Sequence, residues 1–359
     1  MERKKEMNQL LDLIDRPALC IRNGQIYLLN RAATQLGFEV DHPIGPLLGQ
    51  AAEEYERFHE GSLFLNLQRY DLYYAASVFR VEGHDIFVIE QEMDHQILDA
   101  LALAAMKLRD PLSDINAIID QLSPLIRDQE GDTAQHYLDV LHRRMFQIHR
   151  MVCNMSDASR YVSSSAPKLE YVELCSTLED LLDRIEALTS AVGIKLTWDL
   201  PLVDVPTMAD VERLERAVYN MISNAMKATP TGGTIHVTLK RRKERAYLSV
   251  RDHGAGIDPQ ITGSAFTRFR RPPGLESFQE GLGLGMTLIC CGAAAHGGTV
   301  LIDHPADGGT RVTMSIPLRR STDSMVRSDT LIYDYAGEQD HGLLELSDIL
   351  PPEAYRDPR

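Results

Sequence analysis

The stretch at 214–229, LERAVYNMISNAMKAT, constrains this chain of 359 residues most strongly. Its apolar residues recur at helical spacing, which predicts an amphipathic helix with a buried face. The apolar stripe consists of Leu214, Val218, Met221 and Ile222. Asn220, Asn224 and Lys227 follow one another at helical spacing on another side. Amide oxygens can bind a hard cation and a lysine can meet phosphate charge. For this helix alone, a solvated polar face is the competing interpretation.

Two glycine clusters downstream favour a nucleotide site. A β-like run at 246–250 leads into a turn with Asp252, Gly254 and Gly256 in alternation. Glycines there allow a positive φ and a close approach to a flat ligand, and Asp252 could accept a hydrogen bond from an exocyclic amine. The sequence GLGLGM at 281–286 then opens an apolar helical run. Free N–H groups before a helix suit a phosphate chain. A flexible loop explains either cluster alone, but the ordered set of three features is far more specific.

This ordered set resembles the ATP-binding domain of sensor histidine kinases, within the GHKL ATPase superfamily. The matching blocks are NMISNAMKAT, DHGAGI, AFTRFRR, GLGLGM and GGTRVTMSIPL, within residues 171–319. The resemblance implies ATP and Mg²⁺ as cofactors, with Asn224 as the Mg²⁺ ligand. The other ATP-binding residues that it implies are Asn220 near the phosphates, Lys227 facing phosphate, Asp252 on the adenine amine, Gly254 and Gly256 along the adenine, Gly281, Gly283 and Gly285 as the lid hinge, and Thr310 at the base of the adenine pocket.

Asn220 also distinguishes branches of the superfamily. Chaperone and mismatch-repair members carry a glutamate one helical turn before the metal-binding asparagine, where it activates water. Without such a general base, hydrolysis loses a contribution of about 10²–10⁴-fold. The site therefore looks suited to passing a phosphoryl group on.

Two long helical segments, 94–125 and 133–161, precede the ATP-binding blocks. Apolar residues of the second segment alternate three- and four-residue spacing, which is typical of a coiled-coil or four-helix-bundle seam. The seam consists of Leu138, Leu141, Met145, Ile148, Val152 and Met155. A helical hairpin needs a partner to cover such a stripe, so we expect a homodimer built on a four-helix bundle. Sensor kinases carry their dimerisation and histidine-phosphotransfer hairpin at this position.

The acceptor block of this hairpin departs from the family pattern. The family reads His-Glu-x-Arg-Thr-Pro-Leu, whereas this chain reads MKLRDPL at 106–112. Met106 replaces the acceptor histidine, Lys107 replaces its acidic neighbour and Asp110 replaces the phosphatase threonine. Methionine has no nitrogen nucleophile, so autophosphorylation at position 106 is excluded. His95 lies eleven residues upstream on nearly the same helical face and is a weak alternative acceptor. Otherwise it is an ordinary solvated or seam-edge histidine.

The chain is expected to divide into four parts. Residues 1–92 resemble a PAS sensor domain, because two β-like runs joined by an Asn23-Gly24 hairpin signal precede small helices and three more β-like runs. Residues 93–162 form the dimerisation hairpin and residues 163–319 the ATP-binding domain. Residues 320–359 are acidic and are expected to be a mobile tail, with LLEL at 343–346 as its docking motif.

Composition limits the classes of partner. The net charge is −15 and the basic residues are scattered, which argues against a nucleic-acid surface. No apolar stretch approaches the roughly 20 residues that a spanning helix needs. The first residues lack the apolar region of a signal peptide. We therefore expect a cytoplasmic protein without a membrane span.

The sequence predicts an α+β multidomain protein with a PAS-like α/β sensor, a two-helix dimerisation hairpin and an α/β-sandwich ATP-binding domain of GHKL type. The first hypothesis is a histidine kinase-like, ATP-dependent phosphotransferase in a two-component phosphorelay. It would phosphorylate a histidine other than position 106, or one on a partner kinase, and a response regulator is a possible further partner. The second is a catalytically silent pseudo-histidine kinase, an ATP-responsive regulatory binding module. A protein-serine kinase of the anti-sigma type shares the ATP fold but usually lacks the long hairpin.

Overall fold

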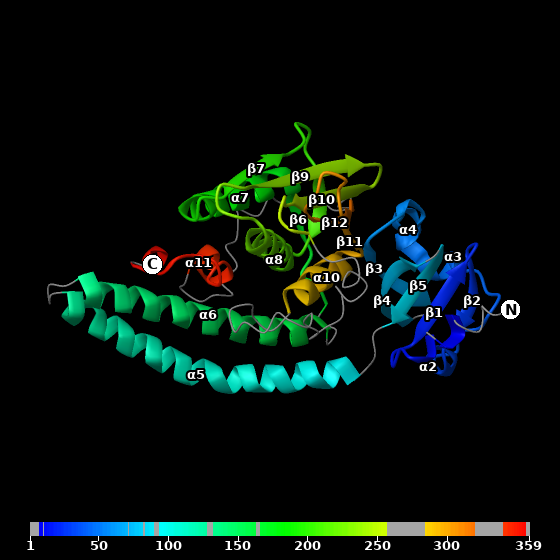
Figure 1. The fold of residues 1–359 in the computed structure, drawn as a ribbon, viewed down its shortest axis with the longest axis horizontal. Coiled ribbons are helices and arrows are strands. Elements are labelled where there is room, and N and C mark those ends of the chain that lie inside the picture. Colours follow the sequence, from blue (N-terminus) through cyan, green and yellow to red (C-terminus); the bar gives the residue numbers. More distant parts are fainter. Residues whose placement is uncertain are drawn as a thin grey trace.

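The computed structural model describes residues 7–9, 11–70, 72–81, 83–89, 93–127, 132–162, 166–256, 284–319 and 340–356. Three regions are visible in Figure 1: a small β-rich region, a long helical hairpin, and an α/β region above the hairpin. No helix among the described residues is both long enough and apolar enough to cross a bilayer.

The β-rich N-terminal region has two strands, then small helices, then three strands. In chain order the elements are β1 (Ala18–Arg22), β2 (Gln25–Leu29), α2 (Arg31–Gln35), α3 (Gly45–Leu48), η1 (Gly49–Ala51), α4 (Ala52–Arg57), β3 (Ser62–Arg69), β4 (Leu72–Val81) and β5 (His84–Ile89). Asn23 and Gly24 join β1 to β2 with φ angles of 51° and 74°, as expected for a tight hairpin turn.

The N-terminal strands and the strands of the α/β region form one sheet of ten strands, in the order β2-β1-β5-β4-β3-β11-β12-β10-β9-β7. Its C-terminal half contains β7 (Lys195–Asp199), β9 (Thr234–Arg242), β10 (Arg245–Arg251), β11 (Val300–Asp303) and β12 (Arg311–Pro317). The junction is the antiparallel pair β3–β11, in which Phe64 faces Val300 and Ser62 faces Ile302. The N-terminal region is therefore hydrogen-bonded to the α/β region along a strand edge.

Three helices of the α/β region, α7 (Leu174–Ala191), α8 (Val211–Ala228) and α10 (Gly285–His296), supply buried side chains to one core with these strands. A separate two-stranded sheet pairs β6 (Glu170–Glu173) with β8 (Pro206–Ala209). Asp210 caps α8, its side chain accepting a hydrogen bond from the Arg213 amide. All four residues of the predicted apolar stripe of α8 are buried, which confirms the amphipathic helix.

The hairpin consists of α5 (Met93–Arg127) and α6 (Asp132–Val162). One set of seven-residue repeats is buried within the chain: Ala105, Leu112 and Ile119 on α5, and Leu138, Met145 and Val152 on α6. A second set stays exposed by 39–46 %: Leu108, Ile115 and Leu122 on α5, and Leu141 and Ile148 on α6. The predicted single seam is thus two stripes. Met145, Val152 and Met155 share one buried cluster with residues of α5 and with Leu284 and Leu288 at the start of α10, so they are already covered within one chain.

The described part of the C-terminal segment differs from the expected mobile tail. It contains α11 (His341–Glu345) and η2 (Pro352–Tyr355), and both views show α11 between α6 and α8. Leu344, Leu346, Leu350 and Tyr355 are fully buried. The expectation of a mobile tail is wrong for residues 340–356. Their apolar side chains pack into the core, and two of their carboxylates form ion pairs with arginines of α6 and α8.

Candidate nucleotide site

Helix α8 carries the polar row that the sequence singled out. Asn220 is 1 % exposed, and its side-chain amide donates a hydrogen bond of 2.8 Å to the Arg216 carbonyl one turn earlier. Asn224 is partly exposed and makes no side-chain hydrogen bond with the described residues. Lys227 lies in the last turn, where its Nζ is 3.1 Å from Asp348 Oδ2. The row therefore runs from a buried amide to an exposed ammonium group.

Asp252 follows β10 and is held by backbone amides. Its side chain is 4 % exposed, and Oδ1 accepts hydrogen bonds from the amides of Gly254, at 2.9 Å, and Thr310, at 3.2 Å. The Asp252 amide in turn donates to the Thr310 carbonyl at 3.0 Å. No hydrogen bond to Oδ2 comes from the residues that the structure describes. The turn thus fixes the carboxylate and leaves one oxygen for a ligand.

Gly254 and Gly256 need to be glycine for different reasons. Gly256 has a φ of 75°, as expected for a turn that only glycine adopts easily. Gly254 does not adopt a positive φ. A Cβ at Gly254 would stand 2.1 Å from the carbonyl oxygen of Ala228, the last residue of α8. The expectation of a positive φ at both positions is therefore wrong for Gly254, where close packing of the turn on α8 sets the requirement.

The N-terminus of α10 lies beside the polar residues of α8. A Cβ at Gly285 would lie 2.9 Å from Asn220 Oδ1 and 3.9 Å from Asn224 Oδ1. The first residue of α10 therefore lies against these two asparagines, here called the amide row. A helix N-terminus carries a partial positive charge and N–H groups without intrahelical partners. Gly281 and Gly283, and the AFTRFRR block, lie outside the described residues.

These elements converge on the second half of α8. The amide row and Gly285 form one side, and Asp252, Gly254 and Thr310 form the other. Among the described residues, no group of three His, Cys, Asp or Glu side chains could hold a metal. The donors present fit Mg²⁺ in another way, because this ion is commonly held by one or two protein oxygens together with substrate phosphates. Asn224 can supply such an oxygen.

The position predicted to correspond to the family's acceptor lies on the hairpin. Met106 is 67 % exposed on α5, whereas its neighbour Ala105 is buried in the hairpin core. Lys107 and Asp110 are also exposed. His95 belongs to α5, but its side chain lies outside the described residues. No nucleophilic nitrogen replaces the missing histidine at position 106.

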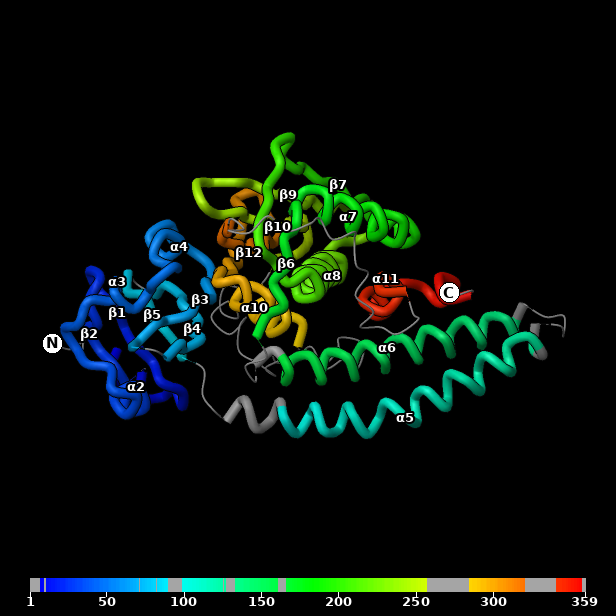
Figure 2. The backbone as a smooth tube through the Cα atoms, turned by 180° about the vertical axis from the view of Figure 1, so that it is seen from behind, coloured from blue at the N-terminus to red at the C-terminus, as the bar shows by residue number. Residues whose placement is uncertain are grey.

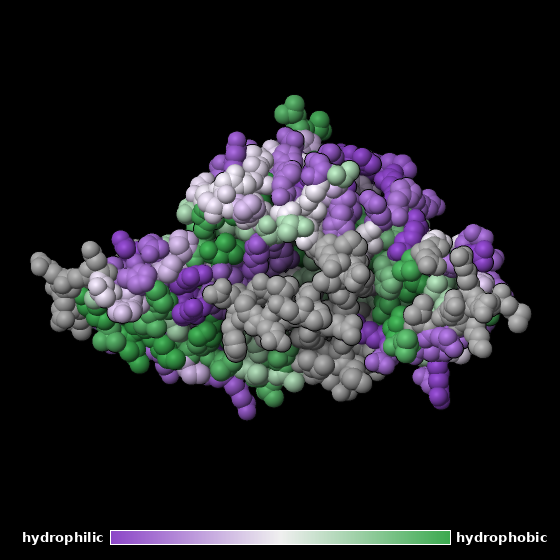
Figure 3. All heavy atoms as spheres, viewed as in Figure 1, coloured by the Kyte–Doolittle hydropathy of each residue, from purple (hydrophilic) through white to green (hydrophobic). Residues whose placement is uncertain are grey.

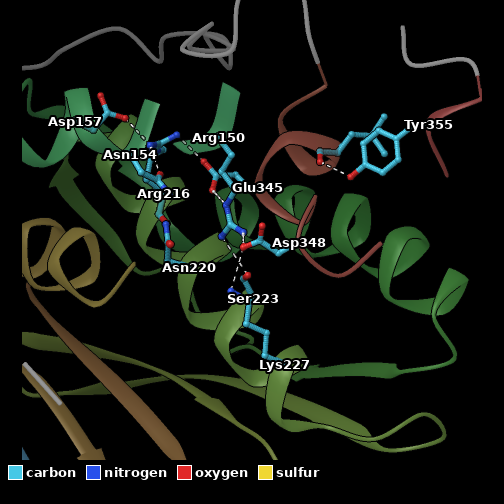
Figure 4. A network of polar contacts seen from close by, with 11 residues as sticks. Arg150, Asn154, Asp157, Arg216, Asn220, Ser223, Lys227, Glu345, Asp348 and Tyr355 are labelled. Carbon is cyan, nitrogen blue, oxygen red and sulfur yellow. Dashed lines mark hydrogen bonds and ion pairs between the residues drawn. The ribbon is translucent and has the colours of Figure 1, made fainter. Parts of the chain in front are cut away.

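A cluster of charged side chains links α8 to α6 and to the C-terminal segment (Figure 4). Arg216, one turn before Asn220, is fully buried and pairs with Glu345 and with Asp157, each at 2.6 Å. Burial raises the pKa of the Asp157 carboxyl, while the nearby arginine opposes this shift. Sequence reasoning missed this cluster. The available signal was Arg216 itself, a charged residue two positions from Leu214 in a helix whose other residues are mostly apolar or small.

A cavity of about 260 Å³ lies elsewhere, over the strands of the α/β region and beside α4. Glu54 and Arg57 line it from α4, and strand residues such as Lys240, Tyr247 and Arg311 form its floor. None of the predicted ATP-binding residues lines this cavity. It is therefore distinct from the convergence of polar groups around α8.

Part of the chain matches a known protein family. Residues 209–320 match the family model described as "Histidine kinase-, DNA gyrase B-, and HSP90-like ATPase". The sensor histidine kinase WalK of Bacillus subtilis is 27 % identical over 343 residues, which cover 89 % of this chain and 56 % of WalK. The histidine protein kinase DivJ of Caulobacter vibrioides is 26 % identical over 246 residues, which cover 64 % of this chain and 40 % of DivJ.

Among solved structures, full-length ShkA in complex with AMPPNP is similar with a TM-score of 0.50. The sequence identity is 22 %, and the match covers 62 % of this chain and 46 % of ShkA, so the similarity concerns the fold. The chain spans only about half of WalK and less of DivJ.

Proposed function

Because the chain belongs to the sensor histidine kinase family and carries its GHKL-type ATP-binding domain, we propose that it binds Mg-ATP beside α8 and transfers the γ-phosphoryl group to a histidine. The observation that carries this proposal is the convergence of two separate segments on the second half of α8, which carries the amide row. These segments are the Asp252 turn and the N-terminus of α10.

On the adenine side, Asp252 Oδ2 accepts the hydrogen bond of the exocyclic amine, while the amides of Gly254 and Thr310 hold the carboxylate in place. Gly256 presents no side chain to the base, and its positive φ would strain any larger residue. Fixing an acceptor in advance lowers the entropic cost of binding. The same carboxylate makes adenine the preferred base, because a base lacking this amine would leave Oδ2 without a partner.

On the phosphate side, Asn224 supplies an amide oxygen to Mg²⁺ and Lys227 supplies a positive charge to the phosphates. Gly285 brings the N-terminus of α10 toward the same region, where its N–H groups favour anions. The Mg²⁺ ion, when bound with ATP, neutralises charge on the phosphates. In phosphoryl transfer, positioning and charge stabilisation provide most of the catalysis.

Asn220 favours transfer over hydrolysis. Its amide cannot take a proton from water, and its Nδ2 already donates to the Arg216 carbonyl within α8. Without a general base, attack by water is slow. The phosphoryl group is therefore kept for a better nucleophile, a histidine other than position 106. We favour a histidine of a partner kinase, in a two-component pathway that also contains a response regulator.

The hairpin and the N-terminal region are proposed to assemble and to regulate this enzyme. A second copy would cover the exposed stripe of Leu108, Ile115 and Leu122 with Leu141 and Ile148, forming a four-helix bundle. Figure 3 shows apolar side chains gathered along the hairpin side of the molecule. The N-terminal region would be a PAS-like sensor, and the β3–β11 pairing gives it a direct mechanical connection to the ATP-binding sheet.

Calorimetry with the non-hydrolysable analogue AMPPNP and Mg²⁺ tests the nucleotide site. Asn224→Ala and Asp252→Ala should each weaken binding by roughly 1–3 kcal/mol, because each removes a polar partner of the ligand. Asn116→Ala, an asparagine-to-alanine change on the hairpin, is the matched control and should leave binding unchanged. Absence of heat with the wild-type protein would refute the proposal.

A further inference from the structure

We propose that residues 340–356, here called the clasp, inhibit the nucleotide site from within the chain, with Asp348 competing with nucleotide phosphate for Lys227. This inference rests on the proposed function, because it assigns a regulator to the same site. Three sets of observations carry it: the clasp is firmly packed, it is joined to α8 by buried charges, and one of its carboxylates contacts Lys227.

The clasp is packed like part of the core. Tyr355 is fully buried, its ring centroid is 5.0 Å from that of Phe146 on α6, and its hydroxyl donates to the Leu343 carbonyl at 2.8 Å. Leu344 and Leu346 belong to the same buried cluster as the inner faces of α7 and α8. Burying apolar side chains of this size stabilises a fold. The clasp therefore holds its place without the help of Asp348.

Side chains of α6 also fix the backbone of the clasp. Arg143 donates to the carbonyls of Ser347, at 3.3 Å, and Asp348, at 3.1 Å. Gln147, one turn later, donates to the Ser347 carbonyl at 3.0 Å. These contacts set the position of the Asp348 backbone, and hence the region that its carboxylate can reach.

Buried charges join the clasp to α8 (Figure 4). Glu345 and Arg216 are both fully buried and lie 2.6 Å apart. Arg150 of α6 contacts both clasp acids, Glu345 at 3.4 Å and Asp348 at 2.7 Å, and donates to Ser223 of α8 at 3.1 Å. Moving the clasp would break a buried ion pair, so it acts as a single stiff bridge between α6 and α8.

The decisive contact lies at the end of this bridge. Asp348 Oδ2, which accepts from Arg150, is also 3.1 Å from Lys227 Nζ. Lys227 is three residues from Asn224, so a phosphate held near the amide row would approach the same ammonium group. One ammonium group cannot pair closely with a carboxylate and a phosphate without bringing the two anions together, which is unfavourable. Nucleotide binding must therefore draw Lys227 away from Asp348 or displace the clasp.

The coupling is reciprocal by thermodynamic linkage. If the clasp weakens nucleotide binding, bound nucleotide weakens the clasp by the same free energy. Because the clasp contacts both α6 and α8, its release would also loosen the ATP-binding region from the hairpin. Nucleotide occupancy and the fraction of molecules in which the ATP-binding region is released from the hairpin would therefore increase together.

The test compares Asp348→Asn with Glu353→Gln in the full chain, again by calorimetry with Mg²⁺ and AMPPNP. Glu353 is a matched control, since it is an exposed clasp carboxylate near His136 on α6 and away from Lys227. Asp348→Asn should tighten binding roughly 5- to 30-fold, because Lys227 would no longer have to leave a carboxylate in order to meet phosphate. Glu353→Gln should not change it. In a Lys227→Met background, Asp348→Asn should lose most of its effect, because the contested ammonium group is gone.

Hydrogen exchange gives a second measurement. Adding Mg²⁺ and AMPPNP to the wild-type protein should speed exchange at the amides of 343–350, whereas protection of these amides would overturn the proposal. Unchanged or weaker binding by Asp348→Asn would overturn it as well, and weaker binding would mean that Asp348 positions Lys227 for phosphate. Wild-type binding combined with an inert Asp348→Asn refutes only the clasp. Absence of binding in every variant refutes both the clasp and the nucleotide site.

Discussion

Replacing Glu345 by glutamine tests whether the buried charges stabilise the ATP-binding region. The side chain keeps its shape but loses its charge, at a position with no solvent exposure. Removing one partner of a buried ion pair typically costs about 3–5 kcal/mol, because the other charge stays buried without compensation. Here Arg216 retains Asp157 at 2.6 Å, and Arg150 retains Asp348 at 2.7 Å. The expected loss is therefore at the lower end, about 3 kcal/mol.

Trp198 provides a probe of this region alone. It is the only tryptophan of the chain and lies on β7, packed against the core that includes α7 and α8. A local signal matters because a multidomain chain need not unfold in one step. With a urea m-value of about 2–3 kcal/mol/M, a loss of about 3 kcal/mol lowers the denaturation midpoint by roughly 1–1.5 M.

Glu353→Gln, which removes an exposed carboxylate from the same segment, should shift the midpoint by less than about 0.3 M, as surface substitutions usually do. Equal midpoints for Glu345→Gln and Glu353→Gln would refute the reasoning. They would mean that Glu345 is hydrated in solution, or that the clasp leaves α6 and α8 without cost.

Two further predictions concern pH and assembly. Burial lowers the pKa of His296, whose ring contacts the Gly292 carbonyl at 2.6 Å and accepts from the Asp210 amide at 2.9 Å. Because the folded pKa lies below the unfolded value, the contribution of His296 to stability is present above about pH 6.5 and is lost as the pH falls. The midpoint reported by Trp198 should therefore drop between about pH 7.5 and 5.5, and His296→Gln should reduce this drop; an identical drop in the variant would contradict the assignment. For assembly, Ile115→Asp should give monomers in light scattering, because it places a charge in the exposed stripe. Ala117→Asp, on the opposite face of α5, should leave a dimer, and a wild-type monomer at micromolar concentration would exclude the four-helix bundle.

Much of the fold could be predicted where the sequence signal is local. The apolar stripe of α8 is regular, so its buried face follows from spacing alone. The Asn23-Gly24 turn has the positive φ angles that its residue types favour. The residues near the amide row could be found because their types and order are unusual for a packed helix and its loops. In each case the interacting residues, or the motif that identifies them, lie close together in the sequence.

The missed features depend on partners that are distant in the sequence. The acidic composition of residues 320–359 predicted a mobile tail, but Arg216, the buried partner of Glu345, lies 129 residues away and no local pattern joins the two residues. The β3–β11 pairing depends on an edge-to-edge contact between strands that are each ordinary in sequence. The hairpin seam divided into two stripes because α5 and α10 together cover part of one of them within the chain, which helical spacing cannot reveal.

The measurement that tests the central claim most directly is incubation with γ-labelled ATP, followed by mass spectrometry under conditions that preserve phosphoramidates. The protein is assayed alone and with a partner histidine kinase whose own ATP site is inactivated, and Asn224→Ala serves as the control. We predict no phosphohistidine on α5 of the protein alone, and label on a partner histidine that depends on Asn224. Label on His95 that is lost in His95→Gln would contradict transfer to a partner. Bound Mg-ATP with no phosphohistidine on either protein would contradict kinase activity altogether.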